Sequence, residues 1–402
     1  MRTVLVTGPG GAGRTTLAAA TALAAARDGA RTLLISADPI PGFPATTAPA
    51  PVTEGLWSVR LDSGAHFRGE LVTLQEQLSG VLELLGGNPL DAEELTELPG
   101  SAELALLHAL RRATHGDWSH EAYDLLVVDL PPLREALALL ALPEQLRRYL
   151  RRLLPQERQA ARALRPMLAQ LAGVPMPAQW LYEAAARRDA ELAQVQALIE
   201  DRATTLWLVA EPGPAAEDAL RTARTGLALY GLRTEALVAN RVLPGHSSDP
   251  FFAALAAQQE KTLGHWGEEG PAPVRVAHLG RDPQGPDDLL ALAGPDGAPT
   301  VPATGGEGGR AEAPWWIEEA GAPGEPEGDG ILVWCLRLPG AVKKDLQLVR
   351  RGGELLLTVG PFHRIVPLEP ALRRCTVTGA ALTDGVLRVR FTPDPALWPR
   401  TS

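Results

Sequence analysis

Residues 1–27, MRTVLVTGPGGAGRTTLAAATALAAAR, decide how this chain folds. The β-branched run Thr3–Thr7 predicts a short buried strand, and the glycine-rich stretch Gly8–Gly13 follows it directly. The alanine-rich segment Thr15–Arg27 predicts a helix, and Arg31–Ile35 predicts a second strand after it. The order strand, loop, helix, strand is typical of a βαβ unit with a glycine loop at its first turn.

The loop itself, GPGGAGRTT over residues 8–16, has the composition of a phosphate-binding loop. Glycines let backbone N–H groups face phosphate oxygens, the helix N-terminus favours negative charge, and a Ser or Thr hydroxyl can bind Mg²⁺. Thr15 supplies that hydroxyl, whereas Arg14 stands where such loops have a lysine. A tight glycine turn without a ligand is the alternative interpretation. The candidate nucleotide-binding residues of the loop are Gly8, Gly10, Gly11, Ala12, Gly13, Arg14, Thr15 and Thr16.

Strand and helix patterns continue to alternate after the loop, over about 280 residues. The apolar runs Tyr123–Asp129, Thr204–Ala210 and Glu235–Asn240 predict further buried strands, with helical periodicity between them. This alternation predicts an α/β fold, a P-loop NTPase parallel sheet wrapped by helices on both faces. Residues 133–200 are predicted as a helical insert within it. The arginines of this insert predict a solvated face, with attraction of acidic partners or lipid headgroups as the alternative; they are Arg147, Arg148, Arg151 and Arg152.

The pattern changes to a period of two after Gly330, where short apolar runs alternate with Gly, Pro and Asp. That pattern predicts a small all-β sandwich. The residues before it are acidic and rich in Gly and Pro, which is typical of a linker, although the pair Trp315–Trp316 within them could dock on a neighbouring domain. The predicted domains are therefore residues 1–292, a linker over 293–329 and a sandwich over 330–395.

Composition excludes several classes of function. The net charge of −10 argues against nucleic-acid binding, and the only cysteines, Cys335 and Cys375, exclude a CxxC zinc site. The chain has three lysines, Lys261, Lys343 and Lys344, so no lysine amine is available in its first 260 residues. No apolar run approaches the roughly 20 residues that span a bilayer, which predicts a cytoplasmic protein with at most indirect membrane contact. The eight histidines are scattered, and the close pair His115 and His120 is interpreted as surface.

An ordered series of motifs in residues 1–290 resembles the ArsA-type ATPases, which include the arsenite-pump ATPase and the ATPase of the guided entry of tail-anchored proteins. The loop GPGGAGRTT resembles their GKGGVGKTT. The ordered series is more specific than any single motif in it. The other matching segments, in chain order, are Ala37–Pro39, Leu98–Glu103, Val127–Asp129, Leu142–Glu144, Arg202–Pro212 and Tyr230–Pro244.

The resemblance implies ATP and Mg²⁺ as cofactors and a homodimer as the working form. It implies that Asp38 positions or activates the attacking water and that Thr15 binds Mg²⁺. It also implies that Asp129 is held to the metal through water, and that Asn240 reads the adenine edge. Residue by residue, the alternatives are a plain turn at Asp38 and a strand-end cap at Asn240.

Three departures from the family pattern predict weak or lost hydrolysis. Pro9 replaces the lysine that reaches the partner's nucleotide in the family, and Arg14 replaces the second loop lysine. The segment after Asp129 lacks the family's threonines, glycine and histidine. Phosphoryl transfer depends on positioned positive charge, and one arginine finger contributes roughly 10³–10⁵ in rate. A protein that binds nucleotide but turns it over slowly, if at all, is therefore expected.

The C-terminal module resembles the α-crystallin domain of small heat-shock proteins. The matching segments are Leu338–Leu346, Gly353–Val359, Phe362–Arg364 and Ala381–Leu387. The alternative is an unrelated β-sandwich. Domains of this kind present strand edges and grooves to peptides or to each other, which implies a chaperone-like role.

Three functions follow, in order of preference. The first is a nucleotide-binding protein whose dimer gates a hydrophobic client or partner protein, with apolar insert residues such as Leu146, Leu150, Met167 and Met176 lining a groove. Ordinary core packing is the alternative reading of those side chains. The second is a nucleotide-independent scaffold or chaperone that acts through the sandwich. The third, driving an arsenical pump, is disfavoured because As(III) prefers thiolates and residues 1–334 contain no cysteine.

Overall fold

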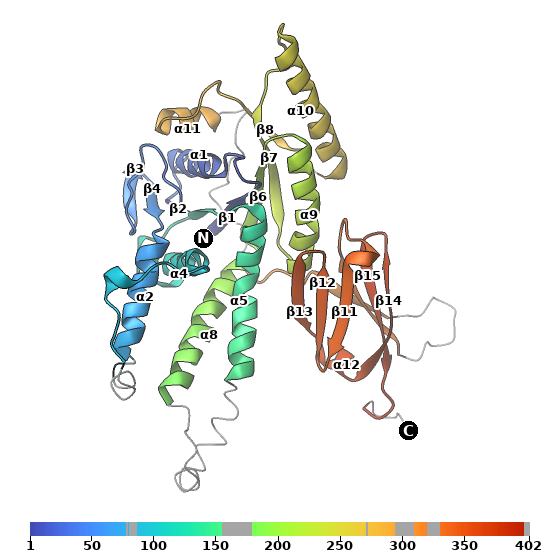
Figure 1. Ribbon diagram of the computed structural model, residues 1–402. Helices are drawn as coiled ribbons and strands as arrows, with labels where there is room; N and C mark the ends of the chain where they lie inside the picture. The colour runs from blue at the N-terminus through green and yellow to red at the C-terminus, as the bar shows by residue number, and fades with distance from the viewer. Residues whose placement is uncertain are drawn as a thin grey trace.

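The centre of the molecule is an eight-stranded sheet. Our computed structural model describes residues 1–77, 79, 87–154, 179–270, 272–293, 309–319 and 330–397. The strands of the sheet are β1 (Arg2–Thr7), β2 (Thr32–Ser36), β3 (Ala50–Thr53), β4 (Leu56–Arg60), β5 (Leu125–Asp129), β6 (Thr204–Ala210), β7 (Thr234–Val242) and β8 (Val274–Ala277). Their order is β3-β4-β2-β5-β1-β6-β7-β8, and only β3 runs antiparallel to its neighbour (Figure 1). The predicted α/β sheet is confirmed, with β1 between β5 and β6.

Helices cover both faces of this sheet. Helices α1 (Arg14–Arg27) and α11 (Pro286–Leu292) bury one face, and α4 (Ser101–His115), α5 (Leu133–Leu153) and α9 (Pro214–Tyr230) bury the other. Neighbouring residues of β1 show the division, because Val4 belongs to the first core and Leu5 to the second. The sheet is therefore buried on both sides, which explains the continuous apolar runs of its strands.

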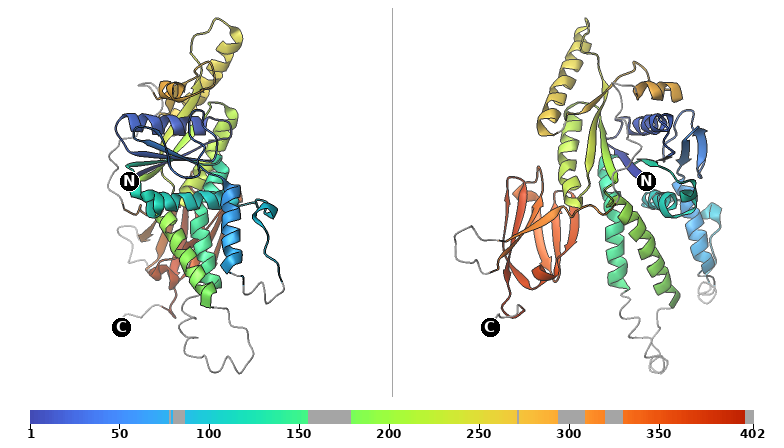
Figure 2. Two further views of the ribbon diagram at one scale, coloured as in Figure 1. Left: turned by 90° about the vertical axis from the view of Figure 1, so that its left-hand side faces the viewer. Right: turned by 180° about the vertical axis from the view of Figure 1, so that it is seen from behind.

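A layer of helices extends below the sheet (Figures 1 and 2). It contains α2 (Ser63–Gln77), α8 (Gln179–Ile199) and the far half of α5, and α10 (Pro250–Glu269) lies at the opposite end of the molecule. The predicted helical insert is present up to Leu154 and again from Gln179. The insert residues Leu164, Met167, Leu168, Leu171 and Met176 lie outside the described residues.

The solvated arginine face predicted on α5 holds for Arg151 and Arg152, whose side chains are 61% and 54% exposed, but not for Arg147 and Arg148, which are 18% and 21% exposed. Arg147 Nε donates to Asp189 Oδ1 of α8 at 3.1 Å, and Arg151 pairs with the same carboxylate. Arg148 forms a two-pronged pair with Glu354, Nε to Oε1 at 2.9 Å and Nη2 to Oε2 at 2.7 Å. These arginines tie α5 to its neighbours, and the acidic partners come from segments that sequence spacing does not reveal.

The C-terminal part is a sandwich of two antiparallel sheets, as predicted. One sheet has the order β14-β15-β10-β9 and the other β11-β12-β13. Trp334, Leu357 and Phe391 are among the side chains buried between them. The strands are β9 (Trp315–Glu319), β10 (Leu332–Arg337), β11 (Leu346–Arg351), β12 (Glu354–Val359), β13 (Phe362–Pro367), β14 (Cys375–Thr383) and β15 (Val386–Pro393).

Strand β9 differs from the linker predicted for residues 293–329. Trp315–Glu319 pairs antiparallel with β10 and forms an edge of the four-stranded sheet. The Trp315 ring lies 6.1 Å from the Trp334 ring, and the Arg364 guanidinium lies 5.2 Å from the Trp315 ring centroid. Trp315 and Trp316 are half-buried, and the packing of their rings together with the strand pairing outweighs the local Gly and Pro content, so the tryptophans belong to the sandwich.

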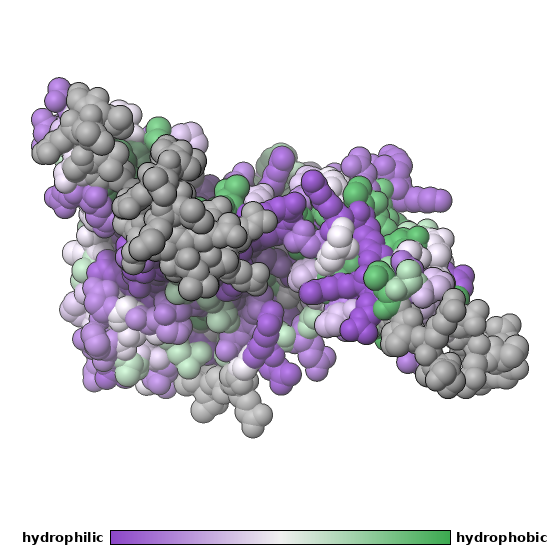
Figure 3. Space-filling model, turned by 90° about the horizontal axis from the view of Figure 1, so that it is seen from below, coloured by the Kyte–Doolittle hydropathy of each residue, from purple (hydrophilic) through white to green (hydrophobic). Residues whose placement is uncertain are grey.

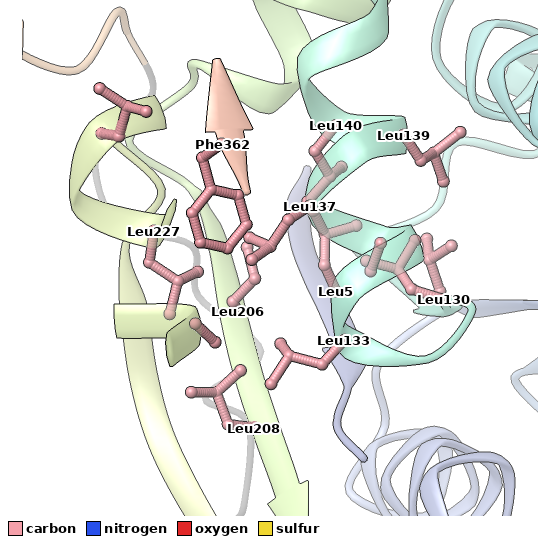
Figure 4. Close-up of a cluster of buried hydrophobic side chains, with 14 of the residues drawn as sticks. Leu5, Leu130, Leu133, Leu137, Leu139, Leu140, Leu206, Leu208, Leu227 and Phe362 are labelled. Carbon is pink, nitrogen blue, oxygen red and sulfur yellow. The ribbon is translucent and has the colours of Figure 1, made fainter. Parts of the chain in front are cut away.

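The sandwich packs directly against the sheet-and-helix body. Phe362 of β13 lies between Leu227 of α9 and Leu137 of α5, near Leu206 of β6 (Figure 4). The buried apolar cluster that includes Leu5 of the central sheet continues without a break to Phe391 of the sandwich. One hydrophobic core therefore joins the two folds.

Polar contacts surround this apolar contact. Arg364 donates to the Leu229 carbonyl at 2.7 Å and pairs with Glu144 of α5 at 3.2 Å. Thr225 Oγ1 donates to the Pro339 carbonyl at 2.6 Å. These bonds fix the orientation of the sandwich on α5 and α9, because each has a defined donor geometry.

The lower face of the molecule is mainly hydrophilic where it is described. Figure 3 shows hydrophilic side chains over much of it, with hydrophobic groups between them. Among the described residues, no helix combines the length and apolar content that crossing a membrane requires.

Candidate functional site

The glycine loop occupies the carboxyl end of β1, where close approaches require glycine. A Cβ on Gly8 would lie 1.8 Å from the Val209 carbonyl oxygen of β6. Gly13 has φ +86° in the left-handed region, and a Cβ there would lie 2.3 Å from Asn240 Nδ2. Gly10 and Gly11 are exposed, with open space where a Cβ would stand. The loop is therefore built tightly on its inner side and open on its outer side, as a phosphate cradle requires.

Two residues of β7 hold the loop from below. Asn240 is buried, and its Nδ2 donates to the Ala12 carbonyl at 2.8 Å. Arg241 Nη1 donates to the Gly11 carbonyl at 3.0 Å. In this structure the Asn240 amide N–H₂ supports the loop, and the adenine contact implied by the resemblance stays a prediction. Arg241 is not among the site residues predicted from sequence; its backbone has a φ of +55°, in the left-handed region.

Two carboxylates and two hydroxyls converge beside the loop. Thr15 Oγ1 donates to Asp129 Oδ2 at 2.7 Å and lies 3.3 Å from Asp38 Oδ2. Ser36 Oγ, at the end of β2, donates to the same Asp129 oxygen at 2.8 Å. The structure thus brings together Thr15, Asp38 and Asp129, all three predicted from sequence. Ser36 was missed, although its place at a strand end next to β5 was a usable signal.

The surroundings of the Asp129 carboxylate favour the binding of a positively charged ligand. The Asp129 side chain is 3% exposed, and its buried Oδ1 accepts no hydrogen bond from any residue that the structure describes. Burial raises the pKa of this carboxyl, and the hydrogen bonds from Thr15 and Ser36 oppose that effect. Mg²⁺ prefers oxygen ligands, so the unpartnered oxygen and the Thr15 hydroxyl fit this ion. Thr15 would hold it directly and Asp129 through a water molecule.

Arg14 does not extend freely over the loop. Its Nη1 donates to the Leu130 carbonyl, and it lies 3.9 Å from Asp129 Oδ1. The guanidinium thus places positive charge beside the buried carboxylate, where a lysine in this position would reach toward phosphate. Thr16 is half-buried in the first turn of α1, and the half-buried Pro9 provides no side-chain donor.

The segment between β5 and α5 is fastened to the loop. Thr7 Oγ1 donates to the Pro131 carbonyl at 2.8 Å, and the Leu133 N–H donates to the Gly8 carbonyl at 3.0 Å. Together with the Arg14 contact to Leu130, these bonds fix the start of α5 to the phosphate loop. Any movement of the loop must therefore displace or break contacts with this helix.

The sequence pattern of the anion-transporting ATPases matches residues 1–277 of the chain. The chain belongs to this family. A second pattern, the HSP20-like domain found in ArsA, matches residues 329–391, which contain most of the sandwich. Both resemblances found in the sequence are thereby confirmed.

Relatives of the anion-transporting ATPase chain cover its full length. An uncharacterized protein of Streptomyces coelicolor is 56% identical over 100% of both chains. A Mycobacterium tuberculosis protein is 29% identical over 99% of this chain and 97% of its own. An Aquifex aeolicus protein, provisionally named arsenical pump-driving ATPase 1, is 25% identical over 93% of this chain and 95% of its own. The combination of ATPase body and sandwich is thus shared by proteins of distant bacteria.

Proposed function

We propose that this protein is an ATP-binding switch with weak or lost hydrolysis, which gates a hydrophobic client or partner protein. The observation that supports it best is the cluster of Thr15, Asp38 and Asp129, in which the buried Asp129 Oδ1 accepts no hydrogen bond from the described residues. Membership in an ATPase family supports the same nucleotide and metal. Bound Mg²⁺ would neutralise phosphate charge, while Thr15, Ser36 and Asp129 orient its ligands.

Slow turnover follows from the charges around the loop. Asp38, the carboxylate that would orient water, is exposed beside Thr15. Arg14 is engaged with Leu130 and Asp129, so it stabilises the resting arrangement of these groups instead of a transferring phosphoryl group. Pro9 offers no cation to a partner subunit. Without positioned positive charge the transition state lacks its main stabilisation.

The switch would act through α5. When Arg14 turns toward phosphate, it must release the Leu130 carbonyl, which lies three residues before α5 begins. The 21 residues of α5 extend over roughly 30 Å. Its far half reaches the sandwich through Glu144 and Arg148. The phosphate loop and the sandwich thus both contact α5, and a ligand that shifts the start of this helix biases its contacts with the sandwich.

A cavity below the sheet supports the proposal that the client is hydrophobic. It has a volume of about 340 Å³, and its walls come from α2, α4, α5 and α8. Apolar side chains form much of the lining, which favours an apolar guest. These side chains are Leu104, Leu107, Leu146, Leu150, Leu192 and Val195.

The test compares binding with turnover in the full chain. We expect ATP to bind more tightly with Mg²⁺ than with EDTA, and turnover to stay far below that of an intact arsenical pump ATPase measured in parallel. Fast turnover that Asp38→Asn abolishes would contradict the impaired hydrolysis. If the protein suppresses aggregation of a client equally well with and without nucleotide, that result would instead favour the nucleotide-independent chaperone. Light scattering of the client with and without ATP decides between these two functions, and small-angle scattering checks the proposed dimer.

A further inference from the structure

Two histidines and a glutamate meet in the helical layer, away from the nucleotide loop. His66 and Glu70 are four residues apart on α2 and so share one face of that helix, and His108 comes from α4. One ligand atom from each lies within 4.8 Å of the other two. The imidazole rings have centroids 4.8 Å apart. All three side chains are half-buried, so the fold positions them instead of leaving them in solvent.

The two imidazoles have no hydrogen-bond partner of their own. Within the described part of the chain, no residue hydrogen-bonds a ring nitrogen of His66 or His108, although their neighbours include Glu70, Arg111, Arg112 and Arg188. Burial lowers the pKa of both rings, and that of His108 falls to about 4. Burial thus disfavours the charged form of both rings, and histidine binds metals in its neutral form.

Glu70 is held in place by the neighbouring helix. Arg188 of α8 donates to Glu70 Oε2, and the same guanidinium donates to Glu191 Oε2 at 3.0 Å. The second oxygen of Glu70 makes no hydrogen bond to any residue that the structure describes. Support of this kind from an outer group orients a metal-ligating carboxylate.

These three side chains line the cavity described above, at the end where α2 meets α4. Space therefore adjoins the cluster, and the remaining walls are largely apolar. A metal held by three protein groups keeps a coordination position for water or another ligand. Here that position would open into the cavity.

We propose that His66, Glu70 and His108 bind a divalent transition-metal ion of the Zn²⁺ class, with an open position toward the cavity. Imidazole nitrogens and one carboxylate oxygen form a ligand set that this class accepts. Bond lengths of about 2.0–2.1 Å place tetrahedral ligand atoms roughly 3.4 Å apart, so the side chains close around the ion by rotation. The site involves none of the nucleotide-binding residues.

The experiment uses the full chain without a histidine tag or nucleotide, freed of metal by a chelator. Titration with Zn²⁺ by calorimetry should show one ion per chain. His66→Gln and His108→Gln should each weaken binding at least tenfold, as loss of even an outer-shell group costs about 10–100-fold. His115→Gln, on the same α4 but exposed, should bind as the wild type does. Absence of Zn²⁺ binding by the wild type, or unchanged affinity in both histidine variants, would overturn the site.

Co²⁺ provides a readout that does not depend on affinity alone. The wild type should give the strong visible absorption of a four-coordinate ion, and added azide should change that spectrum by entering the open position. A spectrum indifferent to azide would refute the open position. Circular dichroism of each variant checks folding, and Glu70→Gln supplies a third variant should a histidine variant fail to fold. Loss of the Co²⁺ bands in folded Glu70→Gln supports the site, and full retention contradicts it.

Discussion

The ring of Phe362 fills the space in which a side chain on Gly226 would stand. A Cβ at Gly226 would lie 2.7 Å from Cε1 and Cζ of that ring, and 3.0 Å from Leu137 Cδ1. The glycine lies in α9 of the ATPase body and the ring in β13 of the sandwich. Contact between the two folds thus depends on the absence of a single methyl group.

Substitution Gly226→Ala should loosen the sandwich from the body. Inserting a methyl group into a packed contact costs about 1–3 kcal/mol, and here it can be relieved by separating the two folds. We expect a lower melting temperature and a larger radius of gyration in small-angle scattering. The matched control is Gly264→Ala in α10, where a Cβ meets open space. The free energy of unfolding of that variant should rise by up to about 1 kcal/mol. An equal loss of stability in both variants would contradict the proposed role of Gly226 in docking the sandwich.

The pair Arg148–Glu354 should make the docking sensitive to acid. Hydrogen bonding by Arg148 lowers the pKa of the Glu354 carboxyl below its ordinary value. A carboxyl with a depressed pKa stabilises the fold above the unfolded-state pKa, and this contribution is lost as pH falls through the folded-state pKa. At pH 6 the free energy of unfolding of the wild type should exceed that of Glu354→Gln by about 1 kcal/mol, and this difference should shrink as the pH falls below about 4.5. Thermal melts of both proteins across pH 3–7 measure the difference.

The control for that pair is Arg151→Ala. Arg151 also pairs with a carboxylate, Asp189, but its side chain is 61% exposed. Exposed ion pairs contribute about 0–1 kcal/mol, so this variant should melt close to the wild type. A larger loss from Arg151→Ala than from Arg148→Ala would show that the pair with the sandwich is not the stronger one.

Substitution Asp129→Asn should abolish the effect of Mg²⁺ on ATP binding without lowering the melting temperature. Burial raises the pKa of this carboxyl, so its ionised form is costly in the folded protein without a cation. The amide removes that cost, and the melting temperature without nucleotide should be unchanged or higher. Mg²⁺ should no longer tighten ATP binding. Calorimetry with and without Mg²⁺ measures this, and a variant that retains the full Mg²⁺ effect would exclude Asp129 from the metal site.

Lysine at position 14 alone should raise the rate of ATP turnover slightly, and lysine at both positions 9 and 14 should raise it much more. Arg14→Lys should raise it only slightly, because the cation from a partner subunit is still missing at Pro9. The double variant Pro9→Lys with Arg14→Lys should exceed it by at least about tenfold, since one positioned cation contributes up to roughly 10³–10⁵ in rate. Steady-state phosphate release at several protein concentrations tests this. A gain that does not depend on concentration would contradict the proposed dimer.

Several elements could be predicted from sequence because local forces define them. The predicted strand Thr204–Ala210 agrees with β6 to the residue, and the predicted strand Thr3–Thr7 agrees with β1 within one residue. In each, the apolar period and the flanking Gly or Pro act in the same direction. Strand β9 could not be predicted in this way, because the residues that hold it, such as Trp334 and Arg364, are distant in sequence.

The residues of the candidate site also fall into those that the sequence predicts and those that it does not. Thr15, Asp38 and Asp129 could be assigned from motifs, since each follows a strand whose end meets the same edge of the sheet. Arg241 and the cluster of His66, Glu70 and His108 could not, because no local pattern marks their partners. The acidic partners of Arg147 and Arg148 could not be assigned for the same reason.

The sequence by itself determined the α/β body, the phosphate loop and the β-sandwich, because periodicity and glycine spacing are local properties of the chain. Only the tertiary structure decided where Arg14 points, what the α5 arginines bind and how the sandwich sits. These depend on contacts between residues that are far apart in sequence, as Arg148 and Glu354 are. Burial and charge pairing act on whatever the fold brings together, so they become visible only once the chain is folded.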